Sequence, residues 1–270
     1  MKKLNKVLAG VLCLAVIGAG TAAFAGCAND DVDTITITGS TSVQPLMEKL
    51  AAEYEKKHDV EINVSGGGSG AGVTDAQSGK NDFGMASRAL KSSETGVVSK
   101  KIADDGIALI ANTACTVTNV TTDEVKALYE SGTPIQGTIQ GAISREDGSG
   151  TRDAFHELIG IESLFTGTGF EAGYSSTTAV ITKIKNNAQA NLVGYICMGS
   201  LKSDVKALKV GGVEATPANV KNGTYSIARP FNIVYKSEAD LSDEAKAFID
   251  WIMGSEGQAV VTSNGYISVL

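Results

Sequence analysis

The chain has 270 residues, of which 43% are hydrophobic and 20% charged, a balance typical of a globular protein that buries a substantial core. It carries 23 basic and 30 acidic residues, a formal net charge of −7, which argues against a nucleic-acid-binding surface. Any anion that the chain binds must therefore be held by a local arrangement of donors, against the overall field of the protein.

The first 26 residues have the pattern of a targeting segment. Three lysines within the first six residues precede an apolar run over 7–17, and small residues lead up to Cys27. Two interpretations follow: cleavage after Ala25, in an A-x-A pattern, or lipidation of Cys27, because FAGC resembles a bacterial lipobox. We favour lipidation and predict a signal peptide over 1–26, a lipid anchor at Cys27 and a polar tether over 27–32.

The rest of the chain is acidic and holds few residues suited to metal binding. Without the three leader lysines it keeps 20 basic and 30 acidic residues, a formal charge of −10. Cys115 and Cys197 can either pair or remain free thiols, and neither belongs to a CxxC motif, so we predict no metal site and no cofactor. His58 and His156 both lie in helix-like contexts, where we expect solvated surface histidines.

Strand and helix patterns alternate along the chain after the leader. In the first part we expect a strand over 34–38, a helix over 45–57, a strand over 60–65, a short helix over 73–79, a strand over 81–87, a polar helix over 92–105 and an apolar strand over 106–112. In the second part we expect a helix over 121–132, a strand over 141–144, a helix over 150–160, strands over 191–199 and 230–236, and one amphipathic helix over 243–265.

This alternation predicts an α/β protein with a largely parallel sheet. The pattern restarts after Asn112, so we predict two lobes: residues 33–111 plus 227–270 form the first and residues 112–226 the second. The apolar strands near 106–112 and 230–236 would cross between the lobes. Proteins of this kind bind ligands where strand ends from both lobes face one cleft.

Hydroxyl-rich loops follow several of the expected strands. They are GSTSVQP (39–45), SGGGSGAG (65–72), NDFGMASR (81–88) and SREDGSGTR (144–152). Three of them lead from a strand to a helix start, where free backbone N–H groups and the positive end of the helix dipole favour an anion. The spacing matches neither a dinucleotide-binding motif nor a Walker A motif nor a hydrolase elbow. The loops therefore indicate an oxyanion-binding site that lacks the motifs of nucleotide-binding proteins.

The loop sequences resemble those of the PstS family, the phosphate-binding proteins of the bacterial ABC phosphate-uptake system. R-x-D/E-G-S-G-T is present over 145–151, and GSTSVQP, GGGSG and DFG match three further loops of the family. This resemblance covers the whole chain after the leader. It implies the two-lobed periplasmic-binding-protein fold of type II, with one phosphate in the cleft.

The resemblance also implies which residues contact phosphate. These are Thr41, Ser42, Ser69, Asp82, Arg145, Ser149, Gly150 and Thr151, with Ser40, Gly70 and Ser87 as additional candidates. An arginine offers a planar fork to two phosphate oxygens. We expect Ser149 to cap the helix that begins near Thr151. Arg152 is expected to form a surface ion pair rather than to act as an accessory charge.

Asp82 has two interpretations. A carboxylate can accept a proton from phosphate but repels sulfate, which has none to donate at neutral pH, so Asp82 would select between the two ions. Alternatively, Asp82 caps a turn before Phe83 and Gly84. We favour the first interpretation.

The resemblance implies an extracytoplasmic, lipid-anchored and monomeric binding protein that delivers phosphate to an ABC permease and breaks no bond. One alternative is a secreted phosphate-ester hydrolase with Ser69 or Ser149 as the nucleophile, but no histidine lies near these loops in sequence. Another is a phosphate sensor or adhesin on the same fold. Turnover of a phosphate ester would identify the enzyme, and neighbouring permease genes would identify the transporter.

Overall fold

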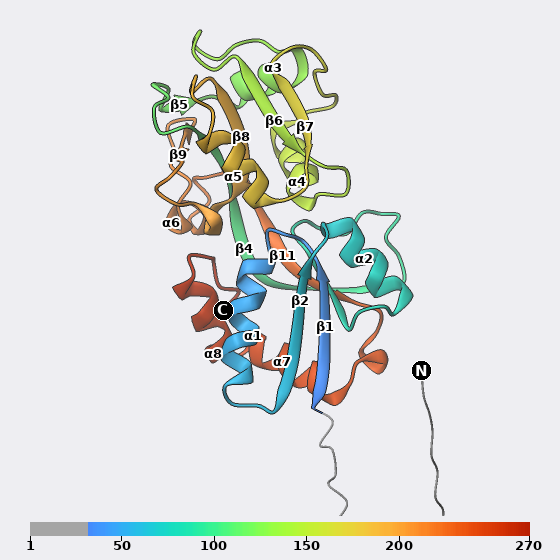
Figure 1. Ribbon diagram of the computed structural model, residues 1–270. Helices are drawn as coiled ribbons and strands as arrows, with labels where there is room; N and C mark the ends of the chain where they lie inside the picture. Colours follow the sequence, from blue (N-terminus) through green and yellow to red (C-terminus); the bar gives the residue numbers. More distant parts are fainter. Residues whose placement is uncertain (1–31) are drawn as a thin grey trace, which may run out of the picture. The chain divides into compact units, whose positions relative to one another are not determined.

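The computed structural model describes residues 32–270, which fold around one mixed nine-stranded sheet with helices packed against it (Figure 1). The α/β class predicted from the sequence is confirmed, but the sheet is mixed rather than largely parallel, because two of its strands pair antiparallel with their neighbours. The predicted signal peptide (1–26), the lipidation site Cys27 and most of the tether (27–32) lie outside the described residues. Within the described part of the chain, no helix is long and apolar enough to cross a membrane.

The elements of residues 32–270 have the following bounds. The strands of the large sheet are β1 (Asp33–Gly39), β2 (Val60–Gly66), β3 (Phe83–Ala86), β4 (Val98–Ala111), β6 (Gly141–Arg145), β7 (Phe170–Tyr174), β8 (Leu192–Cys197), β9 (Lys206–Ala207) and β11 (Ala228–Tyr235), and a separate pair joins β5 (Asn119–Val120) to β10 (Lys209–Val210). The α-helices are α1 (Gln44–Glu55), α2 (Ser69–Ser78), α3 (Thr122–Ser131), α4 (Gly150–Ile159), α5 (Thr177–Lys185), α6 (Pro217–Lys221), α7 (Asp243–Met253) and α8 (Ser255–Ser263), with short 3-10 helices η1 (Met198–Ser200) and η2 (Glu238–Asp240).

The order of strands in the large sheet brings several strand ends to one place. The order is β2-β1-β3-β11-β4-β8-β6-β7, with β9 paired to β4. β1 pairs in parallel with both β2 and β3, and β6 pairs in parallel with β7 and β8. Because the carboxyl ends of parallel strands meet at the same edge, the loops that follow β1, β2 and β3 are neighbours.

β4 links the two ends of this sheet. Its residues 98–106 pair antiparallel with β11, and its residues 107–111 pair antiparallel with β8. The polar helix predicted over 92–105 is wrong, because residues 98–105 belong to this strand. The charged residues of the segment suggested a solvated helix, whereas backbone pairing with the distant β11 determines its conformation.

Two large hydrophobic cores lie along the sheet. One contains α1, α7 and α8 side chains packed on β1, β3 and β11, and the other contains residues of β4, β6, β8, α3 and α4. In the first core, α1 buries Leu46, Leu50 and Tyr54 on one face. We propose that these cores correspond to the two predicted lobes (33–111 plus 227–270, and 112–226). On this division Ile102 belongs to the first core and Ile107 to the second, so the boundary falls inside β4.

Glycines let α2 approach the sheet closely. A Cβ at Gly84 of β3 would lie 2.2 Å from the carbonyl oxygen of Gly72 in α2, and one at Gly72 would lie 2.8 Å from the Cα of Gly39 in β1. No larger residue fits at these contacts without displacing backbone. The close packing holds the first residue of α2, Ser69, next to the residue that follows β3, Ser87.

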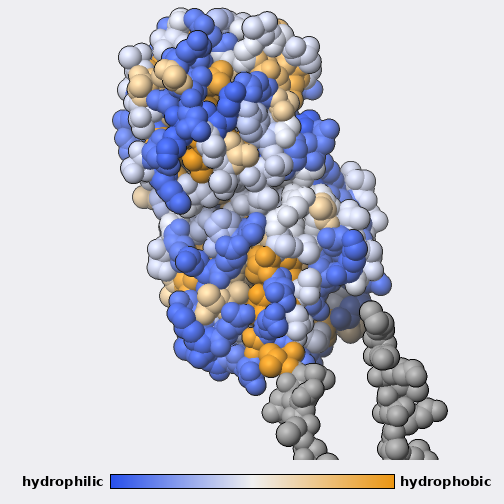
Figure 2. Space-filling view, in the orientation of Figure 1, coloured by the Kyte–Doolittle hydropathy of each residue, from blue (hydrophilic) through white to orange (hydrophobic). Residues whose placement is uncertain are grey.

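The end of the chain and one segment of the second half differ from the prediction. The expected single helix over 243–265 is two helices, because Gly254 between them is extended, with φ −79° and ψ 174°. β7 and α5 were not predicted. Figure 2 shows a visible surface that is mostly hydrophilic or near neutral, with hydrophobic atoms gathered in the lower half of the view. The large exposed apolar residues are Val32, Val98, Leu158 and Leu270.

Cysteines and histidines have defined environments. Cys115 and Cys197 are free and buried, so the open question of their pairing is answered by two separate thiols. His58 is exposed, as predicted, and its ring stacks on Tyr54 at 3.9 Å. The expectation of a solvated His156 is corrected: the residue is half-buried, and its Nε2 is buried without a hydrogen-bond partner in residues 32–270.

His156 makes stability depend on pH. Burial lowers its pKa from 6.5 to about 4, with a further contribution from Arg152. At His156 the unfolded chain therefore binds more protons between these values, so we expect the contribution of His156 to the free energy of unfolding to be highest above about pH 6.5 and to fall as the pH drops toward 4. Relative to wild type, the melting temperature of His156→Gln should therefore rise as the pH falls from 6.5 toward 4, whereas the difference between His58→Gln and wild type should stay constant over this range. Equal profiles for His156→Gln and wild type would contradict the assignment.

Candidate functional site

Six buried hydroxyl groups meet where the loops after β1, β2, β3, β6 and β7 converge. The hydroxyl cluster consists of Ser40, Ser42, Ser69, Ser87, Thr151 and Thr177. The Ser87 Oγ lies 2.9 Å from that of Ser40 and 3.3 Å from that of Ser69. The Ser42 Oγ lies 2.7 Å from Thr151 Oγ1 and 3.3 Å from Thr177 Oγ1. Residues from both ends of the sheet thus form one polar centre.

Gly150 joins the two parts of the hydroxyl cluster. A Cβ on this residue would lie 2.1 Å from the Ser69 Oγ and 2.9 Å from the Ser87 Oγ. Nearby, the Gly70 N–H donates to the carbonyl oxygen of Gly148 at 3.0 Å. Only a residue without a side chain leaves room at position 150 for hydroxyls of the first half to approach the start of α4.

Three helices begin at the hydroxyl cluster. Ser69, Gly150 and Thr177 are the first residues of α2, α4 and α5. The first N–H groups of a helix have no intrahelical acceptor, and the helix dipole is positive at this end. Three such ends together with six hydroxyls form a site rich in hydrogen-bond donors for an anion.

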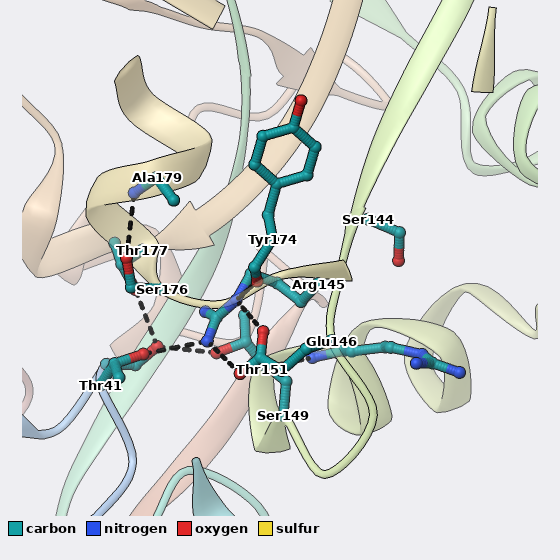
Figure 3. A network of polar contacts seen from close by, with 12 residues as sticks. Thr41, Ser144, Arg145, Glu146, Ser149, Thr151, Tyr174, Ser176, Thr177 and Ala179 are labelled. Carbon is teal, nitrogen blue, oxygen red and sulfur yellow. Dashed lines mark hydrogen bonds and ion pairs between the residues drawn. The ribbon is translucent and has the colours of Figure 1, made fainter. Parts of the chain in front are cut away.

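Arg145, at the end of β6, supplies a buried positive charge. The residue is 1% exposed. Its Nε donates to Glu146 and to the carbonyl oxygen of Tyr174, both at 2.8 Å, and its Nη2 donates to Thr41 at 2.9 Å and to Glu146 at 2.8 Å (Figure 3). Its Nη1 is buried without a partner in the described part of the chain. Because leaving a buried donor unpaired costs about 1–3 kcal/mol, Nη1 marks a place for an acceptor that the protein itself does not provide.

The remaining residues of the SREDGSGTR loop have structural partners. Ser149 caps α4 by accepting from the N–H of Arg152, as predicted. Glu146 orients Arg145, whereas Arg152 pairs with Asp147, whose side chain is 95% exposed. The predicted surface ion pair of Arg152 is therefore present in the structure.

The structure does not bring Asp82 to the hydroxyl cluster. Asp82 precedes β3, whereas Ser87 follows it, and the five steps along the chain between them correspond to about 16 Å in extended conformation. The Asp82 carboxylate accepts the N–H of Thr36 at 2.7 Å and lines a surface hollow with Lys80 and Lys236. The prediction that Asp82 binds the anion and excludes sulfate is corrected: this carboxylate bonds the backbone of β1 at the opposite end of β3, and the alternative of a cap on the turn before Phe83 and Gly84 stays a prediction.

Of the other predicted residues, Ser40, Ser42, Ser69, Ser87, Gly150 and Thr151 lie together, Thr41 contacts Arg145, and Gly70 and Ser149 flank the hydroxyl cluster. Arg88, beside Ser87, is held by Glu94 at 2.7 Å and Asp153 at 3.0 Å.

Sequence reasoning missed Thr177 and Arg229. Thr177 opens α5 after the N-cap Ser176, so the strand–Ser-Ser-Thr-Thr–helix pattern over 170–185 could have indicated it. Arg229, on β11, donates to the carbonyl oxygen of Ser87 at 3.1 Å. A single arginine in an apolar strand gives no comparable signal.

The chemistry of the site is that of an anion receptor. Hydroxyls, helix starts and a guanidinium all donate hydrogen bonds, which suits a compact ion with several acceptor oxygens. Within residues 32–270, no three His, Cys, Asp or Glu side chains gather where they could hold a metal ion. Neither His58 nor His156 hydrogen bonds to a hydroxyl of the cluster, so no imidazole base lies against a serine there.

Comparisons with known proteins agree on one fold. The pattern that defines the PBP superfamily domain matches residues 28–256. Phosphate-binding protein PstS 2 of Streptococcus agalactiae serotype V is 44% identical over 144 residues, 51% of this chain and 48% of that protein. The chain thus matches about half the length of this curated relative. Phosphate-binding protein PstS of Bacillus subtilis is 29% identical over 252 residues, 87% of this chain and 81% of that protein.

Solved structures give the same result. A putative phosphate ABC transporter substrate-binding protein with bound phosphate from Clostridium perfringens is 38% identical, with a TM-score of 0.81 over 88% of this chain and 100% of that one. An ABC-type phosphate transport receptor from Vibrio cholerae is 29% identical, with a TM-score of 0.71 over 87% of this chain and 100% of that one.

The contacts of Gly150 give a testable consequence. In Gly150→Ala, the new methyl group would displace the Ser69 and Ser87 hydroxyls, and we expect at least a tenfold loss of oxyanion affinity, about 1.4 kcal/mol. Calorimetric titration with inorganic phosphate measures it. Gly70→Ala is the matched control, because its Cβ would make only an ordinary contact, 3.5 Å from Gly148 Cα. Equal losses in the two variants would contradict this geometry.

Proposed function

The chain belongs to the PBP superfamily and, within it, to the PstS family of phosphate-binding proteins, and on that premise we propose that it captures inorganic phosphate and delivers it to an ABC permease. The observation that carries the proposal is the unpaired Nη1 of the buried Arg145, next to a centre of buried hydroxyls. Phosphate has four oxygens within a small volume and can satisfy this donor together with several hydroxyls and helix N–H groups.

The donor set supports capture rather than chemistry. Ser149 is occupied as the cap of α4, and the Ser69 hydroxyl bonds the N–H and hydroxyl of Ser87, with no histidine among its partners in residues 32–270. A serine hydroxyl is a weak nucleophile unless a base activates it. The protein therefore acts as a binder and not as a hydrolase. A phosphate sensor or adhesin would have the same site. Phosphate uptake into vesicles that contain the permease, measured with and without this protein, distinguishes a transport protein from a sensor or adhesin.

The cellular setting is part of the same proposal. The protein acts outside the cytoplasm as a monomer, tethered by lipid at Cys27. The superfamily match begins at residue 28, directly after this cysteine, which supports a removable leader before it. Two or more acyl chains would give stable membrane attachment.

Binding of phosphate to protein freed of bound ligand is the direct test. We expect a saturable calorimetric titration and a rise in melting temperature with phosphate, because a ligand that binds only the folded state stabilises it by RT ln(1 + [L]/Kd). Absence of both effects would overturn the proposal.

Arg145→Ala should weaken phosphate binding by about 2–5 kcal/mol, because phosphate oxygens would then be buried without their charged donor. Calorimetry on a variant with an unchanged circular-dichroism spectrum measures the loss. Two substitutions serve as controls that should stay within threefold of wild type: Arg152→Ala, whose partner Asp147 is exposed, and Asp82→Asn, at the far end of β3. An Arg145→Ala affinity within the same threefold range would exclude Arg145 from the site.

Cys27→Ser should release the protein from the membrane, because a serine offers no thiol for lipid attachment. Fractionation of cells followed by detection of the protein measures this change. Cys13→Ser, in the apolar part of the leader, should leave the protein in the membrane fraction. Wild-type protein found free in the medium would instead indicate cleavage after Ala25.

A further inference from the structure

Arg229 contacts the backbone of Ser87, a member of the hydroxyl cluster. It lies on β11 with a side chain that is 1% exposed, and its Nη1 donates to the carbonyl oxygen of Ser87 at 3.1 Å. Its guanidinium carbon lies 5.4 Å from the centre of the Phe231 ring. A buried guanidinium on a central strand is costly unless it is paired, so its partners define what it does.

Asp105 on β4 is the charged partner of Arg229. Asp105 is fully buried, and its Oδ2 lies 3.5 Å from Nη2 of Arg229. Its Oδ1 accepts the N–H of Gly199 at 3.4 Å. Burial raises the pKa of Asp105 to about 7, and the positive charge of Arg229 opposes this rise. The pair is located where β4 passes from β11 to β8, so it fixes the guanidinium relative to both ends of the sheet.

Ser87 is held from two sides. On the side of α2, its N–H donates to the Ser69 Oγ at 3.1 Å and its own Oγ lies within hydrogen-bond distance of Ser40 and Ser69. On the side of β11, its carbonyl oxygen accepts from Arg229. Without Arg229, this buried carbonyl would lose its charged donor and the peptide that carries the Ser87 hydroxyl could rotate.

From these contacts we propose that Arg229, oriented by Asp105, is a positioning residue of the anion site that acts through Ser87. The inference rests on the proposed binding of phosphate and deepens it, because it identifies what aligns one wall of the hydroxyl cluster. Arg229 itself donates to the carbonyl oxygen of Ser87 and to Asp105, not to a hydroxyl of the cluster.

The test is a double-mutant cycle read out as phosphate affinity. Arg229→Gln and Ser87→Ala should each weaken binding at least tenfold. If Arg229 acts through Ser87, Arg229→Gln should cost less than threefold in the Ser87→Ala background, because the hydroxyl that it aligns is already gone. Arg229→Lys retains a charged donor and should recover most of the affinity lost in Arg229→Gln.

A control separates positioning from loss of stability. Gln258 is buried and bonds the carbonyl oxygens of Ile102 and Ile252, remote from Ser87, so Gln258→Ala should lower the melting temperature while its effect on affinity stays the same with and without Ser87→Ala. Additive effects of Arg229→Gln and Ser87→Ala would overturn the inference, as would a wild-type affinity in Arg229→Gln. Both outcomes leave the proposed function intact, whereas wild-type protein that binds no phosphate would refute the proposed function itself.

Discussion

The burial of Arg145 imposes the main constraint on this protein. Removing a guanidinium from water is costly unless most of its donors are paired, and the fold brings Glu146, Thr41 and the Tyr174 carbonyl to it. Thr41 comes from the loop after β1, far from Arg145 in the sequence. The charge therefore holds the two ends of the sheet in contact, and its unpaired Nη1 is left without an acceptor where they meet.

The arrangement of strands explains why neutral groups can complete such a site in an acidic protein. The chain carries a net charge of −7, so its overall field repels anions. At the hydroxyl cluster, helix starts and buried hydroxyls act over short distances in a medium of low polarity, where they are stronger than in water. Local geometry thus prevails over net charge, because the opposing charges are distributed over a solvated surface that screens them.

Because Asp82 lies at the opposite end of β3, the site lacks the carboxylate acceptor that the sequence predicted. In the described part of the chain, no carboxylate hydrogen bonds to a hydroxyl of the cluster. Serine and threonine hydroxyls both donate and accept, so they can receive a proton from a protonated oxyanion as well as donate to its charged oxygens. The nearest charges are held in pairs, Arg145 with Glu146 and Arg229 with Asp105.

The sequence by itself determined the α/β class and most of the site, since these depend on local patterns. Alternating Ile35 and Ile37 specify a strand, and Ser149 with its glycine neighbours specifies a capped helix start. Tertiary structure alone decided what depends on distant partners. The segment over 98–105 is a strand because β11 pairs with it. Asp82 lies outside the site because the pairing of β1 with β3 fixes its position along the sheet. Arg229 reaches Ser87 only because β11 lies beside β3. Short-range sequence patterns contain no information about such pairings, because residues far apart in the chain form them.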